Sequence, residues 1–141
     1  MNKKQRLQVY EKYDGHCAYC GKKIAYNEMQ VDHKVPLFRN DTDEQLAKAG
    51  IKRGSEGFDN LMPSCRRCNF RKGTFTVEQF RKELLKQCEG IIKRSFQVKQ
   101  SIDYGLLKVH LTPVMFYFEK WEHYKRMITN EEETDVPNNL H

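Results

Sequence analysis

The sequence contains no long hydrophobic run and no low-complexity tract. No stretch approaches the roughly 20 consecutive apolar residues that a membrane-spanning helix requires. The opening residues, Met-Asn-Lys-Lys, lead into no apolar signal region. These features exclude a membrane-spanning segment, and we expect a cytoplasmic protein. No internal repeat is visible, and 141 residues suffice for one domain or for a domain with an extension.

Cysteine is scarce but placed in a pattern. Five cysteines in a cytosolic chain argue against a disulfide framework, because that compartment keeps thiols reduced. Four of them form two Cys-x-x-Cys pairs, Cys17 with Cys20 and Cys65 with Cys68, a spacing typical of a structural zinc site. The alternative is two unconnected pairs, or one redox pair. The fifth, Cys88, falls on a predicted helix, and we expect it to be a small core residue.

Positive charge is in excess, but only in part of the chain. Residues 1–99 carry 21 Lys and Arg against 12 Asp and Glu, a net charge of +9. Residues 100–141 carry 4 against 7, a net charge of −3. A basic body with a mildly acidic tail favours a polyanionic partner, most simply nucleic acid. Ordinary solubility charge is the alternative explanation of the same numbers.

The periodicity of apolar residues and the capping signals predict a mixed chain of helices and short strands. We expect helices over residues 3–13, 42–50, 65–72, 77–88 and 116–127, and strands over residues 29–37 and 107–111. In the first strand, Val31 and Val35 are expected to face inward and Asp32 outward. The aromatic stripe in the last helix is expected to be core, and the tail over residues 129–141 to be disordered.

Polar residues lie in a fixed order between and beside the cysteine pairs. They are Asp32-His33 with Pro36-Leu37, then Asp59-Asn60-Leu61 with Pro63, then Asn69-x-x-Lys72-Gly73. Together with the cysteines, this set over residues 17–73 resembles the HNH endonucleases, the ββα-metal or His-Me-finger group. The resemblance is to the subgroup in which the last motif position is Asn rather than His.

The resemblance implies an α+β fold class: a small ββα-metal nuclease core stapled by a four-cysteine zinc site and flanked by helices. We expect the HNH nuclease domain over residues 1–90. Residues 91–128 would form a strand and helix extension that packs on it, with the tail over residues 129–141 following. The segment over residues 39–57 is expected to be an insertion without a chemical role.

The resemblance also assigns catalytic roles. A phosphodiester bond is cleaved by in-line attack of water, which needs a base for the proton and a cation for the leaving oxygen. His33 matches the general base, since an imidazole can accept a proton at neutral pH. Asp32 and Asn69 match the positions that hold one divalent cation, Mg²⁺ or Mn²⁺. Asn60 matches the asparagine that braces the histidine loop.

The implied function is hydrolysis of DNA, with the double-stranded form as the expected partner, leaving 5′-phosphate and 3′-hydroxyl ends. Candidate phosphate contacts are Arg66, Arg67, Arg71, Lys72 and Lys34. Two alternatives stay open. One is a catalytically silent, zinc-stabilised nucleic-acid-binding module. The other is the nuclease component of a homodimer or of a larger assembly.

Overall fold

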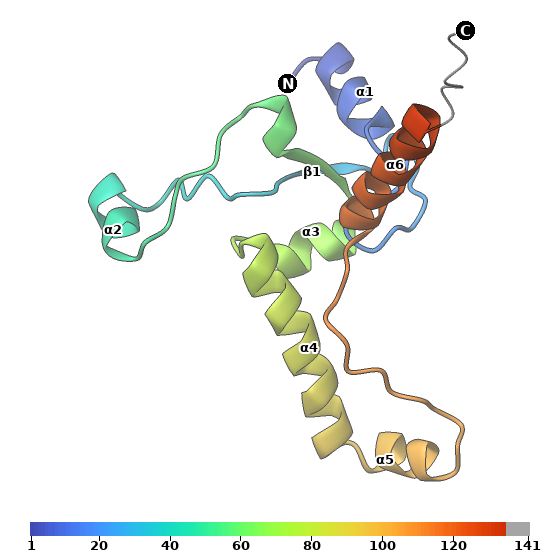
Figure 1. The fold of residues 1–141 in the computed structure, drawn as a ribbon. Coiled ribbons are helices and arrows are strands. Elements are labelled where there is room, and N and C mark those ends of the chain that lie inside the picture. Colours follow the sequence, from blue (N-terminus) through green and yellow to red (C-terminus); the bar gives the residue numbers. More distant parts are fainter. Residues whose placement is uncertain (135–141) are drawn as a thin grey trace, which may run out of the picture. The chain divides into compact units, whose positions relative to one another are not determined.

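The structure is a computed structural model that describes residues 1–134, with side chains up to residue 130. In chain order (Figure 1) the elements are α1 (Lys3–Glu11), β1 (Gln30–His33), α2 (Asp43–Lys48), the 3-10 helix η1 (Phe58–Asn60), β2 (Leu61–Ser64), α3 (Arg66–Lys72), α4 (Val77–Arg94), α5 (Phe96–Asp103) and α6 (Tyr117–Thr134). β1 and β2 pair in a two-stranded sheet, so the prediction of an α+β fold with a small ββα core is confirmed. Among the helices described, none is both long and apolar enough to cross a membrane.

Three helices begin with the same capping device. In each capping box, a side-chain oxygen at the N-cap accepts from a backbone N–H three residues later, and the glutamine there reaches back to the N-cap N–H. The pairs are Asn2 with Gln5, Thr42 with Gln45 and Thr76 with Gln79. These starts are encoded locally, and the predicted starts of α2 and α4 agree with them.

The second half of α4 departs from the prediction. The helix continues through Gly90 to Arg94, and α5 follows directly. Cys88 is exposed on this half, so its assignment to the core was wrong. Phe80 is buried near the start of α4, whereas residues 86–89 are all exposed.

The segment between α5 and α6 has no regular secondary structure. The strand predicted over residues 107–111 is absent from the part of the chain that the structure describes, and Leu107 and Leu111 are both about half exposed. Alternation alone does not make a strand, because the backbone groups need a neighbouring strand to pair with. At the other end of α6, residues 129–134 are helical rather than disordered. The rest of the expected tail, residues 135–141, lies outside the described range.

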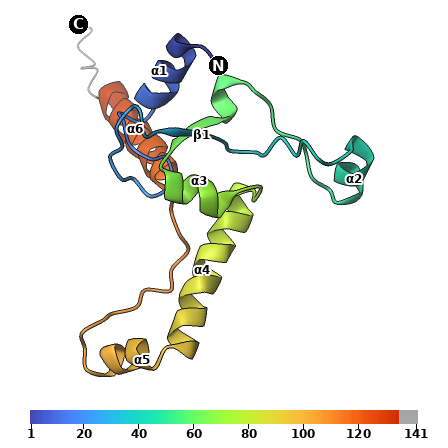
Figure 2. The same ribbon diagram turned by 180° about the vertical axis from the view of Figure 1, so that it is seen from behind.

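The chain divides into two compact units. The first comprises residues 1–31, residues 62–68 and the C-terminal segment from residue 115. Its core is aromatic: Tyr19 meets Phe116 and Phe118 edge-on at ring-centroid distances of 5.5 and 6.2 Å. Backbone hydrogen bonds reinforce the contact, since the Phe118 N–H donates to the Ala18 carbonyl at 2.8 Å. In Figure 2, α1 and α6 of this unit lie near each other. Tyr13, two residues after α1, meets Trp121 of α6 edge-on at a ring-centroid distance of 6.2 Å.

The second unit comprises residues 32–61 and 69–114. Residues 39–57 leave it as an arm of two irregular segments with α2 at its far end (Figure 1). Arg53 ties the two sides of this arm together: its guanidinium donates to the carbonyls of Leu37 and Phe38 at 2.6 Å each and pairs with Asp43 at 3.1 Å. The two sides of the insertion are therefore joined by the specific contacts of Arg53.

Replacing Phe116 by alanine tests the aromatic core of the first unit. Phe116 is 2% exposed, so Phe116→Ala should lower the free energy of unfolding by about 3–5 kcal/mol, through lost burial and the cavity left behind. Urea denaturation of zinc-loaded protein measures the change. Phe96→Ala is the matched control, because Phe96 is 70% exposed and should cost less than about 0.5 kcal/mol. Equal losses for the two variants would contradict this assignment of the core.

Candidate metal and catalytic centre

The four cysteines of the two Cys-x-x-Cys pairs lie together in the first unit. Their Sγ atoms all lie within 4.8 Å of one another. The Sγ atoms of Cys20 and Cys65 are 3.9 Å apart, close to the roughly 3.8 Å that separates two thiolates on one tetrahedral zinc ion. The prediction that both pairs converge on one site is confirmed, and this donor set could hold zinc.

Tight turns present the cysteines. In the first pair, the Cys17 N–H donates to the Lys22 carbonyl at 2.8 Å, and the Gly21 N–H donates to the Cys17 carbonyl at 3.0 Å. Gly21 has φ +76°, a backbone conformation that residues with a Cβ rarely adopt. In the second pair, the Cys68 N–H points at the Cys65 sulfur at 3.4 Å. These backbone contacts therefore hold the four sulfurs close to one another.

The electrostatics of the four thiols also favour a cation. A hydrogen bond from Cys68 lowers the pKa of Cys17 to about 4, and the same bond raises the pKa of Cys68. Burial raises the pKa of Cys20, and the neighbouring Cys17 raises it further. Several adjacent thiolates repel one another, so a divalent metal is the natural counter-charge for the complete set.

A buried ion pair organises the second cluster of polar residues. The Lys72 ammonium lies 3.0 Å from the Asp32 carboxylate and donates to the His33 carbonyl at 2.9 Å. The side chains of Lys72 and Asp32 are 0% and 7% exposed, respectively. Burial lowers the pKa of Lys72, and the charge of Asp32 opposes that shift. Lys72 thus links the end of α3 to the two consecutive residues to which catalysis is assigned.

This pair corrects two expectations. Asp32 is the buried residue of β1, whereas Val31 is half-buried, so the inward and outward faces of the strand were assigned the wrong way round. Lys72 is one of the most deeply buried side chains in the described chain and is not available as a contact for phosphate. A lysine and an aspartate that neutralise each other can both enter the interior, which simple alternation of polar and apolar residues does not anticipate.

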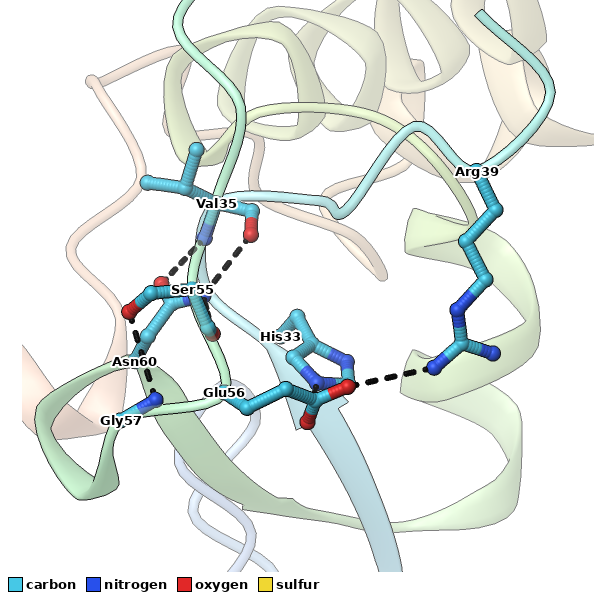
Figure 3. Close-up of polar contacts among 7 residues, drawn as sticks. All are labelled: His33, Val35, Arg39, Ser55, Glu56, Gly57 and Asn60. Carbon is cyan, nitrogen blue, oxygen red and sulfur yellow. Dashed lines mark hydrogen bonds and ion pairs between the residues drawn. The ribbon is translucent and has the colours of Figure 1, made fainter.

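His33 is held by the insertion. Its Nε2 lies 2.9 Å from Oε2 of Glu56, and the other oxygen of Glu56 accepts from Arg39 at 3.3 Å (Figure 3). The hydrogen bond from His33 lowers the pKa of Glu56. The imidazole is partly exposed, at 23% of the side chain, so one edge is fixed by the carboxylate while solvent still reaches the ring.

Asn60 joins the two segments that flank the histidine. Its Oδ1 accepts from the Val35 N–H at 2.8 Å, and its Nδ2 donates to the Val35 and Ser55 carbonyls at 2.9 and 2.8 Å (Figure 3). The Asn60 carbonyl in turn accepts from the Lys34 N–H at 2.8 Å. A single buried amide therefore satisfies backbone groups on both sides of the site, so no apolar residue could replace it without leaving those groups unpaired.

The remaining predicted residues are less tightly connected. Asn69 is half-buried on α3, three positions before Lys72. Arg66, Arg67 and Arg71 are exposed on α3, and Lys34 is half-buried after β1. Two of these arginines line a pocket of about 510 Å³ in the first unit, together with Lys22, Lys23, Ile24, Glu28, Gln30 and Cys65. Four cations and one carboxylate surround this pocket.

Glu56 is the functional candidate that the sequence reasoning missed. The segment over residues 39–57 was expected to lack a chemical role, yet its end supplies Ser55 and Glu56 to the contacts around Asn60 and His33. The sequence feature that could have indicated Glu56 was its position, four residues before Asn60 and between two glycines. An acidic residue in a polar loop is otherwise indistinguishable from solubilising charge.

A family model described as HNH endonuclease matches residues 17–75. Among solved structures, the crystal structure of the Type II-C Cas9 enzyme from Actinomyces naeslundii is similar, with 22% sequence identity and a TM-score of 0.44. That match covers 71% of this chain and 10% of the other, so this chain spans about a tenth of that protein's length. No curated protein matches. The residues matched by the family model include both cysteine pairs, Asp32, His33, Asn60 and Asn69.

Removal of zinc should unfold the first unit. Binding of a structural zinc ion is part of folding and contributes on the order of 10 kcal/mol, so a zinc-selective chelator added in excess Mg²⁺ should abolish the near-ultraviolet circular dichroism of the aromatic core. Cys20→Ser should have the same effect and lose the metal. Cys88→Ser, outside the cluster, should keep one zinc per chain and its fold. A Cys20→Ser protein with full zinc content would refute the site.

Breaking the Lys72–Asp32 pair should be strongly destabilising. Lys72→Met leaves the Asp32 carboxylate buried without its counter-ion, and we expect a loss of about 3–5 kcal/mol in the free energy of unfolding. Urea denaturation is the measurement, and Lys82→Met, at an exposed position of α4, is the control. The double variant Lys72→Met/Asp32→Asn should recover part of the loss. A cost below about 1 kcal/mol for Lys72→Met would show that the pair is not buried in solution.

Proposed function

Because a family model described as HNH endonuclease matches residues 17–75, we propose that the protein is a metal-dependent endonuclease that hydrolyses DNA phosphodiester bonds and leaves 5′-phosphate and 3′-hydroxyl ends. The observation that carries the proposal is the placement of His33. Its ring is partly open to solvent and fixed at Nε2, and it follows directly a carboxylate that is buried and held by a lysine. This is an arrangement suited to proton transfer from a water molecule.

His33 is proposed to act as the general base. With Nε2 hydrogen-bonded to Glu56, the nitrogen that remains for the reaction is Nδ1. Nδ1 takes a proton from water as the water oxygen attacks phosphorus. The P–O bond to the 3′-oxygen breaks, and that oxygen takes a proton from solvent to become the 3′-hydroxyl. Asn60 joins the backbone of Val35, two residues after His33, to that of Ser55, next to Glu56, which limits movement of the base during the reaction.

Asp32 and Asn69 are the residues that would hold the divalent cation. Their carboxylate and amide oxygens are the hard donors that Mg²⁺ and Mn²⁺ prefer, so the donor chemistry fits. When bound, such a cation supplies Lewis-acid stabilisation of the charge that develops on the leaving oxygen. Lys72 fixes the position of the Asp32 carboxylate through the 3.0 Å contact, and the chain's own contribution is this orientation.

The exposed cations of the first unit support DNA as the partner. Lys22 and Lys23 follow the first cysteine pair, and Arg66 and Arg67 lie within the second, yet all four line one pocket. Phosphate contacts of this kind position a nuclease on the backbone without reading base sequence. Residues far apart in sequence thus contribute to one basic surface, which agrees with the positive charge of the first 99 residues.

A second candidate function is a zinc-stabilised nucleic-acid-binding module without catalytic activity. One observation favours it: the Lys72 ammonium already balances the charge of Asp32, which weakens the attraction of that carboxylate for a second cation. The two functions differ in a simple way. The silent module would retard DNA in a salt-dependent manner and leave supercoiled plasmid intact in both Mg²⁺ and Mn²⁺.

The nuclease proposal predicts a metal-dependent nicking activity that requires His33. His33→Ala should lower the rate of plasmid nicking by roughly 10²–10⁴-fold, because it removes the base. Zinc content and circular dichroism should stay at wild-type values. His123→Ala on α6 is the matched control and should nick normally. Unchanged cleavage by a folded His33→Ala protein would eliminate this mechanism.

The basic pocket should contribute to affinity rather than to chemistry. Replacing Lys22 and Arg66 together by glutamine should weaken binding of a DNA duplex and reduce the slope of log Kd against log salt by roughly 1–2. The rate at saturating DNA should hardly change. Lys99→Gln, exposed on α5, is the control variant. Equal salt slopes for the double variant and the wild type would place the DNA elsewhere.

A further inference from the structure

Glu56 makes a contact with His33 that no part of the sequence pattern assigns. We propose that Glu56 is a positioning residue for the nuclease reaction, which fixes His33 in the tautomer protonated at Nε2 and thereby leaves Nδ1 as the base. The inference rests on the proposed function. Its first support is the 2.9 Å distance between His33 Nε2 and Glu56 Oε2, which is short enough for a well-formed hydrogen bond.

The backbone around Glu56 is built to reach the histidine. The Ser55 carbonyl accepts from the Asn60 amide at 2.8 Å, and the Gly54 N–H donates to the Pro36 carbonyl at 2.9 Å. A Cβ added to Gly54 would lie 1.8 Å from the Val35 carbonyl oxygen, so only glycine permits this approach of the two segments. Glu56 lies two residues after Gly54, so this close approach places its side chain beside His33.

The second oxygen of the carboxylate is also engaged. Arg39 donates to Glu56 Oε1 at 3.3 Å, so the two oxygens face two different donors (Figure 3). Both Arg39 and Glu56 belong to the insertion, which therefore brings the carboxylate together with a group that orients it. The same loop that lengthens the connection between β1 and β2 completes the surroundings of the base.

The chemistry follows from the hydrogen-bonding capacity of each group. A carboxylate only accepts, so the shared proton resides on Nε2 and the lone pair on Nδ1 faces away from Glu56. As water is deprotonated, its proton forms a bond to Nδ1, the imidazole becomes an imidazolium, and the negative carboxylate stabilises the new positive charge. A carboxylate that orients a histidine base in this manner raises the rate without touching the substrate.

A surface ion pair without catalytic consequence is the competing explanation. The Glu56 side chain is 66% exposed, and exposed pairs contribute little to stability. The two explanations predict opposite kinetic effects. If Glu56 were only a surface acid near DNA, its removal would reduce repulsion of phosphate, lowering KM and leaving kcat unchanged. If Glu56 positions His33, its removal lowers kcat.

The test compares three variants of the full chain in a plasmid-nicking assay. Glu56→Ala should lower kcat by about 10–100-fold with KM unchanged or reduced, in the range found for residues that orient a ligand or base. Glu56→Gln keeps an oxygen that can accept from Nε2 but lacks the charge, so its kcat should fall between Glu56→Ala and wild type. Glu44→Gln, an exposed acid on α2 of the same insertion, is the control and should behave as wild type.

Nitrogen-15 NMR of the imidazole gives a readout that does not depend on cleavage. At a pH where His33 is neutral, the wild type should show the proton on Nε2, and Glu56→Ala should show a mixture of tautomers. Wild-type kcat in Glu56→Ala, or an unchanged tautomer, overturns the positioning role. A wild-type protein that never nicks DNA overturns the proposed function instead, while the NMR spectrum still reports whether Glu56 holds the histidine.

Discussion

A lysine ammonium buried between a carboxylate and a carbonyl is the contact on which the candidate catalytic site depends. Lys72 reaches both Asp32 and the carbonyl of His33 from the last turn of α3. A charge with no exposed surface is tolerated only when it is paired and hydrogen-bonded, so this contact constrains where β1 ends and how α3 approaches it. The His33 carbonyl is held by Lys72, and the His33 side chain points toward Glu56 in the insertion.

The same contact creates an electrostatic tension at Asp32. A carboxylate that is neutralised by an ammonium attracts a divalent cation less strongly than an unpaired one does. The benefit is orientation, since the Lys72 ammonium holds the Asp32 carboxylate in place. In the proposed nuclease, these two opposing effects would set the affinity of Asp32 for a divalent cation. That affinity would separate an active nuclease from a silent binding module.

The insertion orients His33, the proposed general base. His33 lies at the end of the short strand β1, and the imidazole is oriented by a side chain from the insertion. Residues 54–57 place the Glu56 carboxylate beside it. Asn60 links this loop to the backbone of Val35 through three hydrogen bonds, so the loop and the strand segment form one network. A segment that lengthens a connection can thus supply a specific contact, provided that one amide and one glycine hold its end.

Sequence alone determined the features that depend on short-range spacing. Two Cys-x-x-Cys pairs predict one site because each tight turn presents two sulfurs, and capping boxes predict helix starts because their partners are three residues apart. Only the tertiary structure decided the burial of Lys72, the exposure of Cys88 and the contact between Glu56 and His33. The physical reason is separation along the chain: Lys72 meets the carbonyl of a residue 39 positions away, and Glu56 meets a side chain 23 positions away. Such contacts follow from the path of the whole backbone, which no local pattern of residues encodes.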